Sequence, residues 1–372
     1  MNKAMRARAK RGILPAHAIR RLCEDGHIVC DTPLDADQVQ PASLDLRLGQ
    51  RAWRVRASFL PGRRTMAERL RELALHDMTL EGGAVLETGC VYIIALRESL
   101  RLPPGIAAAA NPKSSTGRID VFTRIITEHG AAFDQVPAGY DGPLYAEVSP
   151  RTFPILVRAG SRLAQLRFRA GPAGGSDAEL RALNAAQPLL AGGAADIDGG
   201  LALRVDLAGA DMTSPIGFRA RRHAGLIDVD AKGALDPLDF FEPITRPGPL
   251  VLDPDEFYIL ASREAVRIPP DWAAEMVPIN PLVGEFRVHY AGFFDPGFGH
   301  AAGGGEGARA VLEVRSHEVP FILEDGQIIG RLIYERLSEQ PEFVYGAGIG
   351  SNYQKQGLKL SKHFKPLDGE TT

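Results

Sequence analysis

Hydrophobic residues along the chain gather in short runs, rich in β-branched and aromatic side chains, that turn-forming residues interrupt every few positions. Glycine and proline, with 40 and 27 copies, supply many of these interruptions. Runs of this length and spacing are typical of strands in an all-β sandwich or barrel. We therefore predict strands over residues 90–96, 144–148, 163–168, 257–261, 311–314 and 328–334.

Two segments have the spacing of short helices instead. Residues 15–24 place Ile19 and Leu22 three positions apart, which puts both side chains on one helical face. Residues 177–187 form a second helical pattern inside a stretch rich in glycine and alanine. The fold class we predict is therefore all-β with a few short helices.

The chain also repeats itself. Residues 91–98 recur as residues 257–264, and residues 144–148 recur as residues 310–314, both 166 positions later. Further matches keep the same order along the chain: Asn111-Pro112 with Asn280-Pro281, Arg118 with Arg287, Pro154 with Pro320 and Gly160 with Gly326. Ordered self-similarity of this kind indicates a tandem duplication of one domain.

We therefore divide the chain into four parts. Residues 12–170 form copy one and residues 200–339 form copy two. Residues 171–199 are a Gly/Ala-rich linker with one short helix, and residues 340–372 are a polar tail that belongs to neither copy.

Length, charge and cysteine content narrow the function classes. The 372 residues suit two or three domains, and 43 Lys+Arg against 46 Asp+Glu give a net charge of −3. That balance argues against a nucleic-acid coat or a polybasic membrane binder. No apolar run reaches the ~18 residues of a membrane span, and no signal-peptide pattern follows the basic start. The three cysteines form no CxxC pair, so we expect a cytoplasmic protein without disulfides.

The sharpest chemical signal is a hydroxyl- and cation-rich segment that follows an apolar run. Hydroxyls and backbone N–H groups can donate to phosphate oxygens, glycine allows close approach, and a guanidinium can bind two oxygens at once. The same residue types are common in turns, so an ordinary surface turn with an arginine is an equal alternative. The residues are Lys113, Ser114, Ser115, Thr116, Gly117 and Arg118.

Each copy carries a glutamate inside an apolar strand, Glu147 in copy one and Glu313 in copy two. If the side chain points inward, desolvation raises its pKa and suits it to general acid–base catalysis. For a single strand, a glutamate on the solvent face is the more frequent case. Recurrence in both copies favours a function, although a shared structural role would also recur.

Copy two contains a tight turn with aromatic flanks over residues 293–299, in which Asp295 precedes Pro296 and Gly297. Such a turn is a plausible platform for a flat base, and a hairpin turn with core aromatics is an equal alternative. The counterpart in copy one, residues 133–142, is longer and less regular.

The tail supplies aromatic and polar residues after the last predicted strand. These residues could fold over a ligand as a lid, although a frayed terminus is the usual case. The candidates are Tyr345, Tyr353, Lys355 and Gln356.

Several familiar signatures are absent from the sequence. No histidine begins a His-x-Glu motif and no CxxC pair exists, so the zinc deaminase signature is missing. The chain also has no GxxxxGK[ST] phosphate loop and no GxGxxG after a strand. We expect no protein-bound metal, and no zinc in particular.

Taken together, these motifs resemble the deoxycytidine triphosphate deaminase family, relatives of the trimeric deoxyuridine triphosphatases. The matching pieces are the Ser114-Ser115-x-x-Arg118 segment, the Asp295 turn followed by Val311-Leu312-Glu313, the tail with Tyr345 and residues 353–357, and residues 41–49, which look like the family's first strand motif. The resemblance covers both copies.

The resemblance implies two tandem distorted jelly-roll domains of the dUTPase-like (β-clip) type. It implies conversion of dCTP and water to dUTP and ammonia, with Mg²⁺ on the triphosphate and no zinc. It further implies that a glutamate shuttles protons while water attacks C4, and that serines and an arginine from a neighbouring domain position water and phosphates. Val311 and Leu312 become substrate contacts. A homo-oligomer is expected, with a trimer favoured and a dimer as the alternative, and dTTP is a candidate inhibitor.

The two copies differ from the family pattern in complementary ways. Copy two has residues 282–286 without hydroxyls before Arg287, whereas copy one has the irregular turn and no tail. We infer one composite site per chain, with Ser114, Ser115 and Arg118 from copy one facing Asp295, Glu313 and the tail. The proton shuttle is then either glutamate, and the intact turn favours Glu313.

The same residues are compatible with two rival functions. A dUTP pyrophosphatase, or a bifunctional deaminase and pyrophosphatase, would need an aspartate over a water aimed at the α-phosphate, and Asp295 or Asp134 could serve. The other rival is a non-catalytic nucleotide-binding regulator, because a fold does not fix a function.

Overall fold

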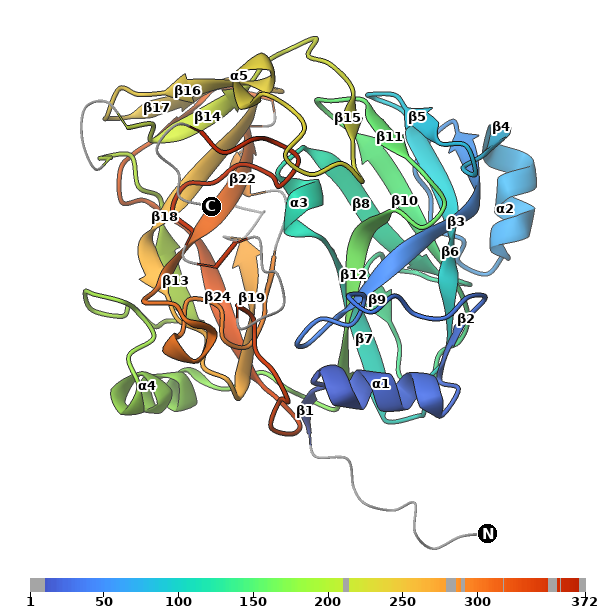
Figure 1. Ribbon diagram of the computed structural model, residues 1–372, viewed down its shortest axis with the longest axis horizontal. Helices are drawn as coiled ribbons and strands as arrows, with labels where there is room; N and C mark the ends of the chain where they lie inside the picture. Colours follow the sequence, from blue (N-terminus) through green and yellow to red (C-terminus); the bar gives the residue numbers. More distant parts are fainter. Residues whose placement is uncertain are drawn as a thin grey trace, which may run out of the picture.

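The computed structural model describes residues 11–209, 214–278, 286–288, 292–316, 318–346, 353–354 and 356–367, with residues 278 and 286–288 described by their backbone alone. Strands dominate these residues, which confirms the predicted all-β class with a few short helices. Figure 1 shows two β-rich halves side by side, copy one drawn in blue to green and copy two in yellow to red. Five of the six predicted strands lie within observed strands, and the sixth, residues 90–96, begins one residue before β6 (Val91–Arg101).

Copy one is built on a large sheet whose path is β8-β10-β6-β3-β12-β7-β9. Three short strands join it off this path, because β1 pairs with β12, β2 with β6 and β4 with β3. The bounds are β1 Gly12–Ile13, β2 Ile28–Cys30, β3 Leu44–Val55, β4 Ala74–Thr79, β6 Val91–Arg101, β7 Ile106–Pro112, β8 Val121–Thr127, β9 Gln135–Val136, β10 Asp141–Pro150 and β12 Arg162–Ala170.

Copy two divides the corresponding strands between two sheets, β16-β14-β18-β22-β20 and β13-β24-β19-β21. Their bounds are β13 Leu201–Arg204, β14 Gly217–Ala220, β16 Phe241–Ile244, β18 Phe257–Val266, β19 Trp272–Pro278, β20 Phe286–Val288, β21 Phe293–Phe294, β22 Ala308–Ser316 and β24 Ile328–Arg336.

The strand register repeats between the copies. In copy one Glu147 of β10 lies opposite Ile93 of β6, and in copy two Glu313 of β22 lies opposite Ile259 of β18. The two glutamates therefore occupy equivalent positions on equivalent antiparallel pairs, as the sequence repeat predicts.

Each copy has a small two-stranded ribbon, and a short strand of copy two extends the ribbon of copy one. In copy one β5 (Ala84–Leu86) pairs with β11 (Ile155–Val157), and in copy two β17 (Leu250–Leu252) pairs with β23 (Phe321–Leu323). The short strand β15 (Ile227–Asp228) of copy two adds to β11 in parallel, so copy two extends a sheet of copy one.

The helices lie at the edges of these sheets. The predicted helices are confirmed as α1 (Ala16–Glu24) and α4 (Asp177–Ala186). The helix α2 (Met66–Leu73) was not predicted, although Thr65 and Glu68 form a capping box whose sequence signature was available. The short helices are α3 (Ser114–Gly117), α5 (Pro237–Phe240) and η3 (Ala301–Gly303).

A continuous apolar core crosses from copy one into copy two. At the crossing, Phe153 meets Phe240 and Phe241 edge to face with ring centroids 5.5 Å apart, and Phe364 of the tail packs on the same two rings. Aromatic packing of this kind fixes the copies against each other.

Cys23, Cys30 and Cys90 are all free thiols, so the prediction of no disulfides is confirmed. None of the helices in the described ranges has the length and apolar character needed to cross a membrane.

Candidate active site between the two copies

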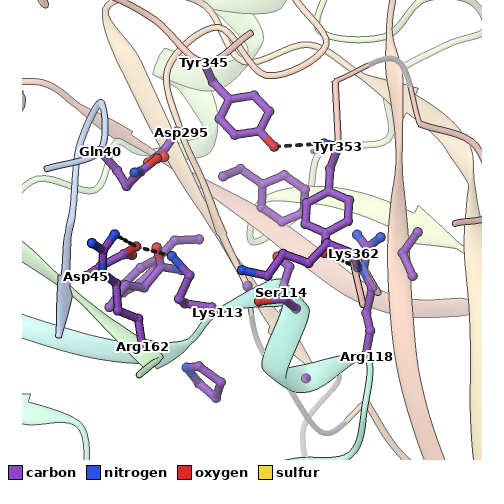
Figure 2. Close-up of a pocket in the computed structure, with 18 of the residues that line it drawn as sticks. Gln40, Asp45, Lys113, Ser114, Arg118, Arg162, Asp295, Tyr345, Tyr353 and Lys362 are labelled. Carbon is purple, nitrogen blue, oxygen red and sulfur yellow. Dashed lines mark hydrogen bonds and ion pairs between the residues drawn. The ribbon is translucent and has the colours of Figure 1, made fainter. Parts of the chain in front are cut away.

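A cavity of about 560 Å³ lies where the two copies meet. Copy one contributes α3 and the start of β3, copy two contributes the Asp295 turn and the middle of β22, and the tail contributes aromatic and cationic side chains. Figure 2 shows these side chains converging from the three sources. The cavity is thus built from parts far apart in the sequence.

The helix α3 carries the serines into this cavity. Strand β7 ends at Pro112, and Lys113 is extended and accepts hydrogen bonds from the N–H groups of Thr116 and Gly117. Proline has no N–H to continue a ladder, which favours the change from strand to helix here. Ser114 and Ser115 then line the cavity at the first turn.

Arg118, directly after α3, is buried and held by the tail. Its Nη1 donates to the Lys359 carbonyl and its Nη2 to Gln356 Oε1, each at 2.9 Å, and its guanidinium lies 4.0 Å from the centre of the Tyr353 ring. Its Nε lies 4.0 Å from Glu313 Oε1. The guanidinium therefore links copy one, copy two and the tail at a single point.

Glu313 lies on β22 with its carboxyl buried against the cavity. Burial raises the pKa of Glu313 to about 8, and the Arg118 guanidinium opposes this shift. The carboxyl is therefore protonated at neutral pH but close enough to its pKa to exchange a proton, which is the property of a general acid–base group.

Asp295 lies in the turn that the sequence predicted, and this turn needs glycine. Gly299 has φ +64, and a Cβ there would lie 2.1 Å from the Val266 carbonyl oxygen. Burial raises the pKa of Asp295, and Arg167 opposes the shift. Phe293, Phe294 and Phe298 of the same turn line the cavity.

Arg167 is a buried arginine of copy one that reaches into copy two. Its Nη1 donates to the Ala274 carbonyl at 2.9 Å, and its Nη2 donates to the Phe294 carbonyl at 3.2 Å and to Asp295 Oδ1 at 3.3 Å. Its guanidinium also lies 4.1 Å from the centre of the Phe293 ring. Arg167 therefore fixes the Asp295 turn from across the interface.

The tail is tied to the turn and to α3. Gln354 Nε2 donates to the Gly297 and Gly303 carbonyls at 3.2 and 3.0 Å, and the Tyr353 N–H donates to the Tyr345 hydroxyl at 3.2 Å. Ser361 Oγ donates to the Ser115 carbonyl at 2.8 Å. The tail thus closes one side of the cavity.

The structure brings most of the sequence-predicted site residues together, and sets three apart. Those that line the cavity are Lys113, Ser114, Ser115, Gly117, Arg118, Asp295, Val311, Glu313, Tyr345, Tyr353 and Gln356. Thr116 and Leu312 are buried beside it without lining it, and Glu147 lies away from it. Lys355 lies outside the described residues, as do Asn280, Pro281 and residues 282–285, while Arg287 is described by its backbone alone.

Glu147 has a different environment from Glu313. Its Oε1 accepts from Nε of Arg124, on the neighbouring strand β8, at 3.1 Å. The Arg124 guanidinium lies 3.5 Å from the centre of the Phe133 ring and donates to Ser58 Oγ at 2.8 Å. In copy one this position is therefore an internal ion pair.

Several cavity residues were not singled out from the sequence. Asp45 forms ion pairs with Lys113 and Arg162, and it belongs to the 41–49 motif, so a signal existed. Lys232 and Lys362 are single cations without a motif, and only their position at the cavity identifies them.

Comparisons with known proteins agree with this geometry. Residues 10–172 match the family model described as the 2'-deoxycytidine 5'-triphosphate deaminase (DCD) N-terminal domain, and residues 176–364 match the model of its C-terminal domain. The crystal structure of 2'-deoxycytidine 5'-triphosphate deaminase from Agrobacterium tumefaciens is 58% identical, with a TM-score of 0.85, and covers 88% of this chain and 99% of its own.

Shorter curated relatives match as well. A "dCTP deaminase, dUMP-forming" from Beutenbergia cavernae is 32% identical over 154 residues, which are 38% of this chain and 76% of that protein. A "dCTP deaminase" from Natronomonas pharaonis is 32% identical over 161 residues, which are 42% of this chain and 79% of that protein.

Proposed function

Because the chain belongs to the 2'-deoxycytidine 5'-triphosphate deaminase family, whose members are hydrolases, we propose that it converts dCTP and water to dUTP and ammonia at the cavity between its two copies. The observation that carries this proposal is a buried glutamic acid, Glu313, 4.0 Å from Arg118 and in one cavity with the α3 serines. This set supplies a proton-transfer group, a cation beside it and hydroxyl donors.

The raised pKa of Glu313 supports a scheme in which this group acts first as an acid. Protonated Glu313 donates to N3 of cytosine, which makes C4 more electrophilic. The carboxylate that forms takes a proton from the water attacking C4 and passes it to the amine. The C4–N bond then breaks and ammonia leaves, while the hydroxyl left on C4 becomes the carbonyl and returns its proton to Glu313. Each step alternates the acid and base forms of one group, which needs a pKa near the working pH.

Arg118 acts in this scheme on Glu313 and on the tail. Its two Nη atoms already donate to Gln356 and Lys359, so the structure favours a positioning role over the direct phosphate binding that the sequence suggested. Its charge stabilises the Glu313 carboxylate that exists between the first two proton transfers.

The phosphates lie at the α3 end of the cavity, beside Lys113, Ser114 and Ser115. Lys113 and Arg162 already engage Asp45, and Arg167 engages Asp295, so these carboxylates are not a ready-made cage for a cation. Within the described residues, no three His, Cys, Asp or Glu side chains come together as a metal site. This donor set fits Mg²⁺ that arrives on the triphosphate, where it neutralises phosphate charge.

The test incubates the full chain with dCTP and Mg²⁺ and measures ammonia, nucleotides and pyrophosphate separately. Ammonia with dUTP supports the proposal. Ammonia with dUMP and pyrophosphate would identify a bifunctional enzyme, and tight dCTP binding without ammonia would identify a regulator. A zinc chelator, followed by Mg²⁺, should leave the rate unchanged. Trimer formation and inhibition by dTTP stay predictions from the family resemblance.

A further inference from the structure

A second ion pair joins the two copies close to Arg118 and Glu313. Asp120 lies two residues after Arg118 in copy one, and Arg315 lies two residues after Glu313 on β22. Arg315 Nη2 donates to Asp120 Oδ2 at 2.6 Å, and its Nε donates to the same oxygen at 3.2 Å. Here copy one supplies the acid and copy two the base, the reverse of the first pair. Neither Asp120 nor Arg315 lines the cavity, so the pair is not placed to contact substrate.

Arg315 is held by groups from both copies. Its Nη2 also donates to Thr152 Oγ1 of copy one at 2.9 Å, and its Nη1 donates to the Asp255 carbonyl of copy two. The Thr152 hydroxyl in turn donates to Asp120 Oδ2. Asp120 is 1% exposed and Arg315 is 7% exposed, so little water reaches the pair. A planar guanidinium bound in this way fixes direction as well as distance.

This ion pair carries two costs that apolar packing does not. Asp120 has φ 55, in the left-handed region that a residue with a Cβ rarely adopts. Two charges also lose their hydration, and a buried ion pair need not stabilise a fold more than apolar side chains of the same size. Aromatic packing of Phe153 on Phe240 and Phe241 already holds the copies together. Backbone strain and buried charge that stability does not require indicate a functional role.

The strand β22 is attached to other segments on both sides of Glu313. Before it, Gln356 Nε2 of the tail donates to the Arg309 carbonyl at 2.9 Å, and the Arg309 N–H donates to the Gln356 carbonyl at 3.0 Å. After it, Arg315 is bound to Asp120. The separation of 4.0 Å between the Glu313 carboxyl and the guanidinium beside it therefore depends on both attachments.

The sequence repeat shows that the arginine is not a general feature of this strand. Glu313 matches Glu147 of copy one, 166 positions earlier, and by the same offset Arg315 matches Ser149. Ser149 lies on β10 opposite Phe122 of β8 and has no charge. The arginine therefore occurs in the copy whose glutamate lines the cavity, and a neutral residue replaces it in the copy whose glutamate does not.

We infer that Asp120 and Arg315 are positioning residues for deamination, because their ion pair sets the register of β22 against α3 and thereby the distance at which Arg118 meets Glu313. The inference rests on the proposed function for the reaction that this distance serves. Apolar packing is non-directional and does not fix such a register by itself. A displacement of about 1 Å at a reaction centre can lower a rate about 10²-fold. The pair therefore acts on turnover without touching the substrate.

The experiment measures kcat and KM for ammonia release from dCTP, and the free energy of unfolding in denaturant, on the full chain. Asp120→Asn and Arg315→Met each leave one buried charge unpaired, and asparagine tolerates the left-handed backbone. Each variant should lower kcat about 10–100-fold, leave KM within about threefold, and be less stable than the unaltered protein. The double variant removes both charges, so it should recover most of the stability while kcat stays low.

Arg124→Met is the matched control for the loss of a buried ion pair. It leaves Glu147 without its cation inside copy one, away from the cavity. This variant should lose stability and keep kcat within about twofold. A comparison with Arg315→Met therefore separates the loss of an ion pair from the loss of the register between the copies.

Unchanged kcat in the single variants, or recovery of both kcat and stability in the double variant, would overturn the inference, since either result describes a purely structural pair. If the single variants do not fold, the double variant decides. Its crystal structure should show Arg118 and Glu313 farther apart by about 1 Å, and an unchanged separation would contradict the inference. This readout needs no turnover. The proposed function fails separately, if the unaltered protein releases no ammonia from dCTP.

Discussion

Glu147 and Glu313 occupy the same position in the two copies, yet Glu313 lines the described cavity between the copies and Glu147 does not. Both are buried in strands that pair in the same register. Glu313 meets Arg118 from the other copy, whereas Glu147 meets Arg124 from the next strand of its own copy. A glutamate at this position is therefore a candidate catalytic group in copy two, as Glu313, and part of a structural ion pair in copy one, as Glu147.

The segment between β3 and β4 in copy one, and its counterpart between β14 and β16 in copy two, account for the difference. In copy one, residues 56–73 fold back as α2 over the Glu147 region, and apolar side chains of this segment pack with Phe133 and Tyr145. In copy two, the equivalent segment, residues 221–240, instead crosses to copy one through β15. The connection in copy one folds back and fills the space beside Glu147. The connection in copy two crosses to the other copy and leaves room for a ligand beside Glu313.

The largest expected effect comes from removing each carboxylate in turn. Glu313→Gln keeps the shape of the side chain but cannot shuttle protons, so ammonia release from dCTP should fall by about 10²–10⁴-fold or more while dCTP still binds. Glu147→Gln should retain most of the rate. Steady-state kinetics and calorimetry on both variants check this, and the opposite outcome, an inactive Glu147→Gln and an active Glu313→Gln, would reverse the assignment.

The second largest effect concerns the free energy of unfolding, which should depend on pH because Glu313 is buried. An ordinary glutamate has a pKa of 4.5, and that of folded Glu313 is about 8. Between these values the unfolded chain releases a proton that the folded chain keeps, so stability falls as pH rises through this window. Glu313→Gln removes this loss of stability. In denaturant unfolding, the free energy of unfolding of the variant should exceed that of the unaltered protein by about zero below pH 5 and by a few kcal/mol above pH 8. A constant difference across this range would refute the assigned burial.

Arg118 should matter somewhat less than Glu313. Arg118→Ala removes the cation beside Glu313 and the anchor of the tail, so kcat/KM for dCTP should fall about 10–100-fold. Arg118→Lys should restore only part of the rate, because an ammonium cannot serve Gln356, Lys359 and the Tyr353 ring together. Unaltered kinetics in both variants would remove Arg118 from the site.

The smallest effect on turnover is expected from changes to the ion pair between Arg124 and Glu147 in copy one. Arg124→Met leaves Glu147 buried without its cation, and unfolding free energy should fall by about 2 kcal/mol, less than for a fully buried pair because Arg124 is partly exposed. The rate with dCTP should stay within about twofold. The double variant with Glu147→Gln should recover part of the stability, whereas a large loss of rate in either protein would show that this region contributes to catalysis.

Local patterns predicted the strands, α1, α4 and the repeat, because periodicity and turn residues are written directly in the sequence. The asymmetric loss of motifs also suggested which parts of the two copies belong together, and the structure places Ser114, Arg118 and Glu313 at one cavity. The pocket-filling course of residues 56–73 and the reach of Arg167 could not be predicted in this way. Both depend on packing between segments that are distant in the sequence. The hydrophobic pattern around Arg167, or around Ser58 in the segment 56–73, therefore does not indicate them.

The contact between Ser361 and Ser115 joins residues separated by 246 positions. During synthesis, copy one leaves the ribosome well before residue 361, so the Ser115 carbonyl of α3 lacks its Ser361 partner until that residue has emerged. Among the described residues, the lining of the cavity is complete only once Lys362 has emerged. A chain cut before residue 361 by premature termination or proteolysis would keep the strands of both copies and lose Ser361 and Lys362 from the site.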